Sequence, residues 1–114
     1  MPILVTLNTK ATPPVTVSPT PYEIMTKGSS QITWSPAANQ NFTFVSVTFA
    51  PSASHSFGAP TNTGAAVYIN DDNSNNGTPT DYPYTVIVSQ NGMNYSSDPP
   101  GPAATGGKPV IRNH

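Results

Sequence analysis

Cysteine is absent from this 114-residue chain, and only 8% of its residues are charged. The absence of cysteine excludes disulfides, thiolate metal sites and cysteine nucleophiles. It also favours a reducing compartment, because small secreted domains often depend on disulfides. A typical domain is about one quarter charged, so the polar surface here must consist mostly of Ser, Thr, Asn and Gln. The net charge of −1 gives little mutual repulsion, and proteins close to neutrality associate readily.

Basic residues and long apolar runs are equally scarce. The four basic residues form no patch that would attract a nucleic acid, so we expect no nucleic-acid partner. No apolar run approaches the length that spans a membrane, so we expect no membrane partner. The segment Met1–Leu7 lacks the basic and apolar regions of a signal peptide, which predicts a cytoplasmic protein. The four basic residues are Lys10, Lys27, Lys108 and Arg112.

The sequence has no 3.6-residue hydrophobic period, and its 14 prolines leave little room for helices. Strands are predicted instead, most clearly around Asn91-Gly92, a dipeptide typical of a two-residue hairpin turn. In the strand before this turn, aromatic and β-branched residues recur at every second position, which predicts one buried face. A lone hairpin is marginal in water, so a second layer must cover that face. The alternating residues are Tyr82, Tyr84, Val86 and Val88.

Further short strands are expected on both sides of this hairpin, separated by Pro- and Gly-rich turns. Trp34 alternates with Ile32 and is predicted to lie in the core. Between Phe44 and Val45 the alternation slips, which indicates either a strand covered on both faces or a β-bulge. We therefore predict one domain, residues 1–114, with an all-β, immunoglobulin-like antiparallel β-sandwich of about seven to nine short strands. The further segments are Ile3–Leu7, Val15–Val17, Tyr22–Met25, Ser30–Trp34, Asn41–Phe49, Ala65–Ile69 and Pro109–Ile111.

Several short motifs resemble the DP-EP family, a group of uncharacterised bacterial proteins. They are Lys27-Gly28-x-x-x-Ile32-Thr33-Trp34, the Tyr-rich strand with Asn91-Gly92-x-x-Tyr95, Ser97-Asp98-Pro99, and the closing Pro109–Asn113. The resemblance covers nearly the whole chain, although the sequence has no Glu-Pro dipeptide. It implies a bacterial source and supports the sandwich fold. It implies no activity, because none is established for the family.

The loop Asp71–Asp81 is the best candidate for a metal site, with calcium as the expected cofactor if it has one. Calcium takes six to eight oxygen ligands, and Asp72-x-Ser74-x-Asn76-Gly77 has the spacing of the first half of a calcium loop. The second half does not match, since its twelfth position is Pro83, but Asp81 would supply a late carboxylate. The alternative is a solvated loop whose Asn and Asp residues favour turns. The candidate ligands are Asp72, Ser74, Asn76 and Asp81.

Candidates for catalysis are few, and we expect no enzyme. The only histidines are His55 and His114, and adjacency of His55 to serines is not the geometry of a catalytic triad. Tyr82, Tyr84 and Tyr95 are candidate binding residues, because tyrosine rings present flat apolar faces on which sugars stack. Their alternating positions are equally typical of core residues.

Together these features favour a non-catalytic binding or assembly module. Exposed strand edges at Val15–Val17 or Val110–Arg112 would pair with a second copy, giving a homo-oligomer, or with a protein or peptide partner. The alternative is a calcium-dependent or carbohydrate-binding module centred on Asp71–Asp81 and the tyrosines.

Overall fold

A computed structural model describes residues 2–25, 27–49, 57–73, 78–98 and 108–114. These residues form ten strands, and the part of the chain described contains no helix long and apolar enough to cross a membrane. The strands are β1 (Ile3–Leu7), β2 (Val15–Ser18), β3 (Tyr22–Ile24), β4 (Ser30–Pro36), β5 (Thr43–Phe49), β6 (Thr61–Asn62), β7 (Val67–Asp71), β8 (Thr80–Gln90), β9 (Met93–Ser96) and β10 (Val110–Asn113).

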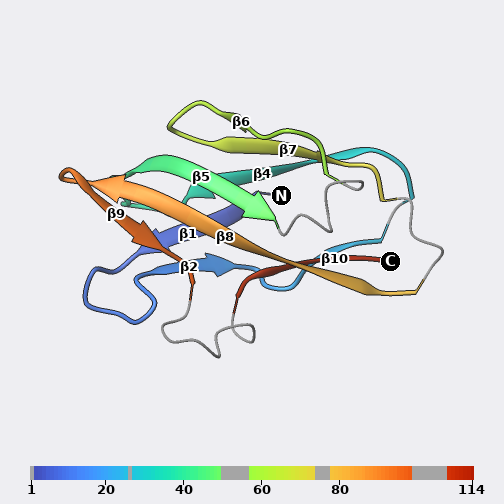
Figure 1. The fold of residues 1–114 in the computed structure, drawn as a ribbon, viewed down its shortest axis with the longest axis horizontal. Coiled ribbons are helices and arrows are strands. Elements are labelled where there is room, and N and C mark those ends of the chain that lie inside the picture. Colours follow the sequence, from blue (N-terminus) through green and yellow to red (C-terminus); the bar gives the residue numbers. More distant parts are fainter. Residues whose placement is uncertain (1, 26, 50–56, 74–77, 99–107) are drawn as a thin grey trace.

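The strands form two stacked sheets, so the predicted all-β sandwich is confirmed. One sheet has the order β2-β1-β4-β7-β6, and the other has the order β3-β10-β8-β5, with β9 also paired to β8. In Figure 1, β5 and β8 of the second sheet lie over β1 and β4 of the first. Two details differ from the prediction. The described ranges contain ten strands rather than seven to nine. Both sheets are mixed, because β1 pairs with β4 and β3 with β10 in parallel.

The hairpin around Asn91-Gly92 forms as predicted. β8 and β9 pair up to Gln90 and Met93, so Asn91 and Gly92 make the two-residue turn. Their φ angles are 54° and 78°, in the left-handed region that Asn and Gly tolerate better than other residues. The local sequence therefore determines where β8 reverses.

The slipped alternation in β5 corresponds to a β-bulge. Phe44 pairs with Val88, but the next paired residue, Ser46, faces Ile87, so Val45 is the extra residue. Val45 is 42% exposed, while Phe44 and Val47 on either side are buried. Of the two interpretations of the sequence, the bulge is the correct one, because it restores Val47 to the core face.

The core lies between the two sheets and is organised around Trp34, as predicted. Trp34 on β4 is fully buried, and its ring meets the Tyr84 ring of β8 edge-on, with the centroids 5.3 Å apart. The predicted buried face of β8 is also present, since Tyr84, Val86 and Val88 are at most 1% exposed. The buried hydrophobic residues include Ile3, Val5, Val15, Ile32, Trp34, Phe44, Val47, Val67, Ile69, Tyr84, Val86, Val88 and Ile111.

One of the two predicted sheet edges is wrong. Val110–Arg112 belong to β10, which lies between β3 and β8 and is therefore an inner strand. The prediction took β10 for an edge because it is the last strand in the sequence. In the structure, β3 from the N-terminal half of the chain pairs with the side of β10 that does not face β8. Val15–Val17 lie in β2, which is an edge strand as predicted.

Candidate functional site

The two sides of the sandwich differ in how their edges are protected. On the side of β5, the Asn62 side chain donates through Nδ2 to the carbonyl oxygens of Phe44 (3.0 Å) and Val45 (3.1 Å). The Phe44 amide also donates to the Gly64 carbonyl at 2.9 Å. These bonds occupy backbone groups at the outer edge of β5, so this edge is partly closed to another strand.

On the other side, the outer edge of β2 pairs with no strand among the described residues. Val5 and Leu7 direct their backbone groups away from β2, because the Val5 carbonyl accepts from the Ala37 amide and the Leu7 amide donates to Gln40 Oε1. Val5 and Leu7 face Val17 and Val15 in the antiparallel ladder. In such a ladder, facing residues direct their backbone groups either both inward or both outward. Val15 and Val17 therefore present their N–H and C=O groups outward.

A shallow groove lies beside this open edge. It is mostly apolar, with the Thr and Ser side chains as its polar part. Pro13 precedes β2 and Pro109 precedes β10, so the groove reaches from one sheet to the other. A strand added to β2 would have apolar surface beside it for alternate side chains. The lining residues are Pro13, Val15, Thr16, Val17, Thr20, Ser97 and Pro109.

The structure does not gather the predicted calcium ligands among the residues that it describes. Asp72 is exposed, and Asp81 lies on β8, where it pairs with Arg112 at 2.6 Å. Ser74 and Asn76 lie outside the described residues. Within the described ranges, no three His, Cys, Asp or Glu side chains come close enough to hold a metal ion.

Oxygen-rich side chains do converge next to that loop, but they are different ones. Asp71, Asn73 and Asn113 are 0%, 1% and 0% exposed, although Asp71 begins the loop that the sequence suggested was solvated. Asp71 Oδ1 accepts a hydrogen bond from the Asn73 amide and another from Asn113 Nδ2, both at 3.0 Å. Asn73 Nδ2 donates to the Ile24 carbonyl at 3.4 Å. The buried polar cluster of Asp71, Asn73 and Asn113 thus links β7 of one sheet to β3 and β10 of the other.

The second carboxylate oxygen of Asp71 has no hydrogen-bond partner among the described residues. Asp71 Oδ2 is buried and forms no hydrogen bond within the described structure, and the same holds for Ser30 Oγ. Ser30 faces Asp71 directly across the β4–β7 ladder. Burial raises the pKa of the Asp71 carboxyl above its ordinary value, and the negative charge of Asp72 acts in the same direction. The two hydrogen bonds to Oδ1 oppose this rise without cancelling it.

Sequence reasoning missed this cluster, although the sequence contains a signal for it. Val67 and Ile69 alternate inward on β7, and Asp71 and Asn73 continue the same period of two. Asn113 follows Ile111 inward on β10 in the same way. The polar character of these residues led to the prediction of a loop, whereas the alternation would have placed them in the core.

The three tyrosines of the predicted binding platform lie on the inner face of their sheet, and only Tyr84 is fully buried. Tyr84 is 1% exposed, and burial raises the pKa of its hydroxyl well above the usual range. Tyr82 shares the alternation of Tyr84 and meets the Phe57 ring edge-on at 5.2 Å. Tyr95 faces the buried Val88 across the β8–β9 ladder and packs against the core. Tyr82 and Tyr95 are each partly buried against the core, so the hypothesis of a sugar platform stays a prediction.

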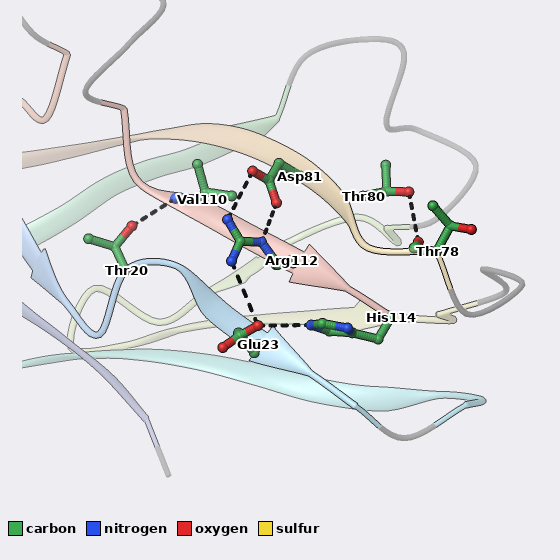
Figure 2. Close-up of polar contacts among 8 residues, drawn as sticks. All are labelled: Thr20, Glu23, Thr78, Thr80, Asp81, Val110, Arg112 and His114. Atoms are coloured by element: carbon green, nitrogen blue, oxygen red, sulfur yellow. Dashed lines mark hydrogen bonds and ion pairs between the residues drawn. The ribbon is translucent and has the colours of Figure 1, made fainter.

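The charged strip of Glu23, Asp81, Arg112 and His114 runs across the outer face of β3, β10 and β8. Figure 2 shows the Arg112 guanidinium between Asp81 and Glu23. Arg112 Nε donates to Asp81 Oδ1 at 2.6 Å, and its Nη1 lies 3.8 Å from Glu23 Oε1. His114 Nε2 lies 2.8 Å from the same Glu23 oxygen. These contacts connect side chains of the three strands, but exposed pairs of this kind contribute little to stability. The backbone pairing of β10 with β3 and β8 holds the strands side by side.

Replacing Arg112 with Gln should raise the pKa of Asp81. The hydrogen bond from Arg112 is the main cause that holds the pKa of the Asp81 carboxyl below its ordinary value. Because the pKa of Asp81 is lower in the folded protein than in the unfolded chain, the ionised carboxylate stabilises the folded state above pH 3.8. This stabilisation is lost as the pH falls through the lowered pKa. NMR titration of the Asp81 carboxyl checks this. In the control K108Q, which removes the pair with Asp98 instead, the titration of Asp81 should not change. An unchanged titration in R112Q would contradict the assignment.

Comparisons with known proteins add no family name. No family model matches the chain, and no curated protein matches it either. The resemblance to the DP-EP family therefore stays a prediction.

Proposed function

We propose that this protein is a non-catalytic binding module that adds an extended segment of a partner polypeptide to the open edge of β2. The observation that carries the proposal is the outward direction of the Val15 and Val17 backbone groups on an edge that no described strand covers. Main-chain hydrogen bonds to these groups would supply affinity, and the groove beside β2 would select the side chains. The sequence predicted binding at two strand edges, and this proposal uses only the one at β2.

The size of this edge favours a linear peptide over a second folded copy. β2 has four residues, which span roughly 13 Å at about 3.3 Å per residue. Stable interfaces between folded proteins bury about 1,200–2,000 Å², much more than pairing over such a short strand supplies. The prolines at positions 13, 14, 19 and 21 limit the edge on both sides, because proline has no amide hydrogen to donate.

The partner segment should be apolar at alternate positions and weakly charged. Val15 and Val17 line the groove with Pro13 and Pro109, and none of the described residues in the lining is charged. β1 pairs with the inner edge of β2 and has the sequence Ile-Leu-Val-Thr-Leu. It is therefore an example of a strand sequence that pairs with β2. A synthetic peptide with this sequence, with one lysine added at each end for solubility, is therefore a suitable probe.

Replacing Val17 with Pro should abolish binding of this peptide without disrupting the pairing of β2 with β1. The Val17 amide points outward, so proline removes a donor from the open edge and none from the β1–β2 ladder. Titration followed by the two-dimensional amide spectrum checks this. In the unmodified protein, the Val15 and Val17 signals should shift, and their hydrogen exchange should slow. The matched control V17T keeps the amide and the β-branched shape, and it should still bind.

The same titration distinguishes the alternatives. Signals that shift on β5, or not at all, would argue against β2 as the binding edge. Light scattering over a dilution series measures association with a second copy. A defined dimer that V17P abolishes would show that the edge accepts another folded copy, and it would overturn the preference for a linear peptide.

A further inference from the structure

The outer side of β2, β1, β4, β7 and β6 forms an uncharged face. Side chains alternate between the core and the outside along each strand, and the outward residues meet in register across the sheet. They are Thr, Ser, Gln and Asn, with Leu4 and Tyr68 as the exceptions. None of the described strand residues on this face is charged, whereas Glu23, Asp81 and Arg112 lie on the outer face of the second sheet. The two faces therefore suit different partners.

Tyr68 on β7 is the aromatic residue of the uncharged face. Its neighbours Val67 and Ile69 are buried, so the Tyr68 side chain lies on the outer face, where it is half-buried. Every other aromatic residue of the chain belongs to the core or packs against it. The position of Tyr68 is therefore not explained by packing between the two sheets.

Hydrogen-bonding side chains surround Tyr68. Thr33 of β4 and Thr61 of β6 face it from either side, with Cβ atoms about 4.5–5.5 Å apart in such pairs. Gln31 and Asn70 face each other in the next row, about 7 Å further along the strands. None of these five side chains forms a hydrogen bond with another described residue. Their donors and acceptors thus remain available to a ligand, unlike the charged side chains of the second sheet, which pair with one another (Figure 2).

We propose that the uncharged face binds a neutral carbohydrate chain at Tyr68. A sugar ring has C–H groups on its flat side and hydroxyl groups around its rim. The Tyr68 ring offers a flat apolar surface for the C–H groups. The neighbouring threonine hydroxyls and the Gln31 and Asn70 amides both donate and accept, as sugar hydroxyls do.

The charge and the apolar content of the face favour this ligand over others. A nucleic acid or an acidic polysaccharide requires basic side chains, and the described strands place none on this face. A folded protein partner requires an apolar centre, but Leu4 and Tyr68 lie on β1 and β7, with β4 between them. A neutral carbohydrate needs neither feature.

This site is separate from the open edge of β2. In Figure 1, β2 and β7 lie on opposite sides of their sheet, with β1 and β4 between them. The edge binds through backbone groups of Val15 and Val17, whereas the face binds through side chains. Both ligands would fit at the same time, so the protein would attach a partner polypeptide to a carbohydrate. The site also uses a different tyrosine from the three predicted from the sequence.

The test is a titration with neutral hexasaccharides, followed by the two-dimensional amide spectrum. The probes are cellohexaose, chitohexaose, maltohexaose and xylohexaose, and at least one should shift the signals of Thr33, Thr61 and Tyr68. Y68A should weaken binding of that sugar by about tenfold, which corresponds to about 1.4 kcal/mol. Y68F keeps the ring and should bind nearly as well. The matched control T48A changes a threonine on the outer face of the second sheet, and it should bind unchanged.

Each other outcome overturns the site. If none of the sugars shifts the Tyr68 signal, or if only signals of the second sheet shift, the uncharged face is not a carbohydrate site. If dextran sulfate shifts the same signals as strongly, binding does not depend on neutrality. If the Tyr68 signal changes on dilution of the protein and not with sugar, the face is an interface between two copies. The spectrum of the unmodified protein decides the question even if Y68A fails to fold.

The two proposals fail separately. V17P should still bind the sugar, and Y68A should still bind the peptide with the β1 sequence, because the two sites share no residue. Loss of sugar binding in V17P would place the sugar at the β2 edge and overturn the site at Tyr68.

Discussion

Replacing Trp34 with Ala should lower the free energy of unfolding by about 3–5 kcal/mol, the range found for large aromatic residues removed from cores. Trp34 is fully buried on β4, and its ring contacts Tyr84 and Phe49 of the opposite sheet, with centroids 5.3 and 6.4 Å away. The substitution removes the largest side chain between the two sheets and leaves a cavity. Because domains of this size have total stabilities of about 5–15 kcal/mol, the variant should be marginally folded.

Denaturant unfolding followed by circular dichroism measures this effect, since the variant lacks the only tryptophan. M93A is a suitable control, because Met93 is 60% exposed on the β8–β9 hairpin and should change stability by less than about 0.5 kcal/mol. W34F should fall between the two. A loss below about 1 kcal/mol for W34A would mean that the two sheets do not pack through this residue.

The elements that depend on local chemistry could be predicted from the sequence. Asn91-Gly92 specifies its turn because both residues tolerate positive φ. The slipped alternation at Val45 specifies a bulge, and the position of Trp34 in an alternating run specifies burial. Each of these signals acts within a few residues, so it does not depend on which strands become neighbours.

Features that depend on long-range pairing could not be predicted in this way. Whether Val110–Arg112 form an edge depends on β3, almost 90 positions earlier in the chain, and no local pattern specifies that pairing. The mixed character of the sheets has the same origin, because β1 and β4 pair in parallel across an intervening crossover. The open edge at β2 was predicted correctly because prolines on both sides limit its pairing locally.

The buried polar cluster depends both on a local sequence pattern and on long-range pairing. Its alternation with Val67 and Ile69 was visible in the sequence, but the partner that makes burial of Asp71 tolerable, Asn113, comes from the other sheet. Burying a carboxylate costs free energy unless it is paired. The prediction therefore placed Asp71 in a solvated loop because of its charge, although its alternation with Val67 and Ile69 indicated burial. The structure shows that a cross-sheet amide supplies part of that pairing.

Replacing Asp71 with Asn should make the protein more stable than the unmodified form at neutral pH. The amide keeps an oxygen that accepts from the Asn73 amide and from Asn113 Nδ2. It also places a donor at the position of Oδ2, which has no partner in the described parts of the chain. The gain should be about 1–3 kcal/mol, the usual cost of an unsatisfied buried polar group.

The dependence on pH identifies the carboxyl as the cause. Burial raises the pKa of Asp71 in the folded state above 3.8, so the folded protein binds the proton more tightly than the unfolded chain does. Stability from this group is present below pH 3.8 and is lost as the pH rises through the raised folded value. The difference in unfolding free energy between D71N and the unmodified protein should therefore grow with pH across that window and then stay constant. D72N, which removes an exposed carboxylate, should reproduce at most a small part of this change. If the difference in unfolding free energy between D71N and the unmodified protein does not vary with pH, the pKa of Asp71 is not raised in the folded protein, and this explanation is wrong.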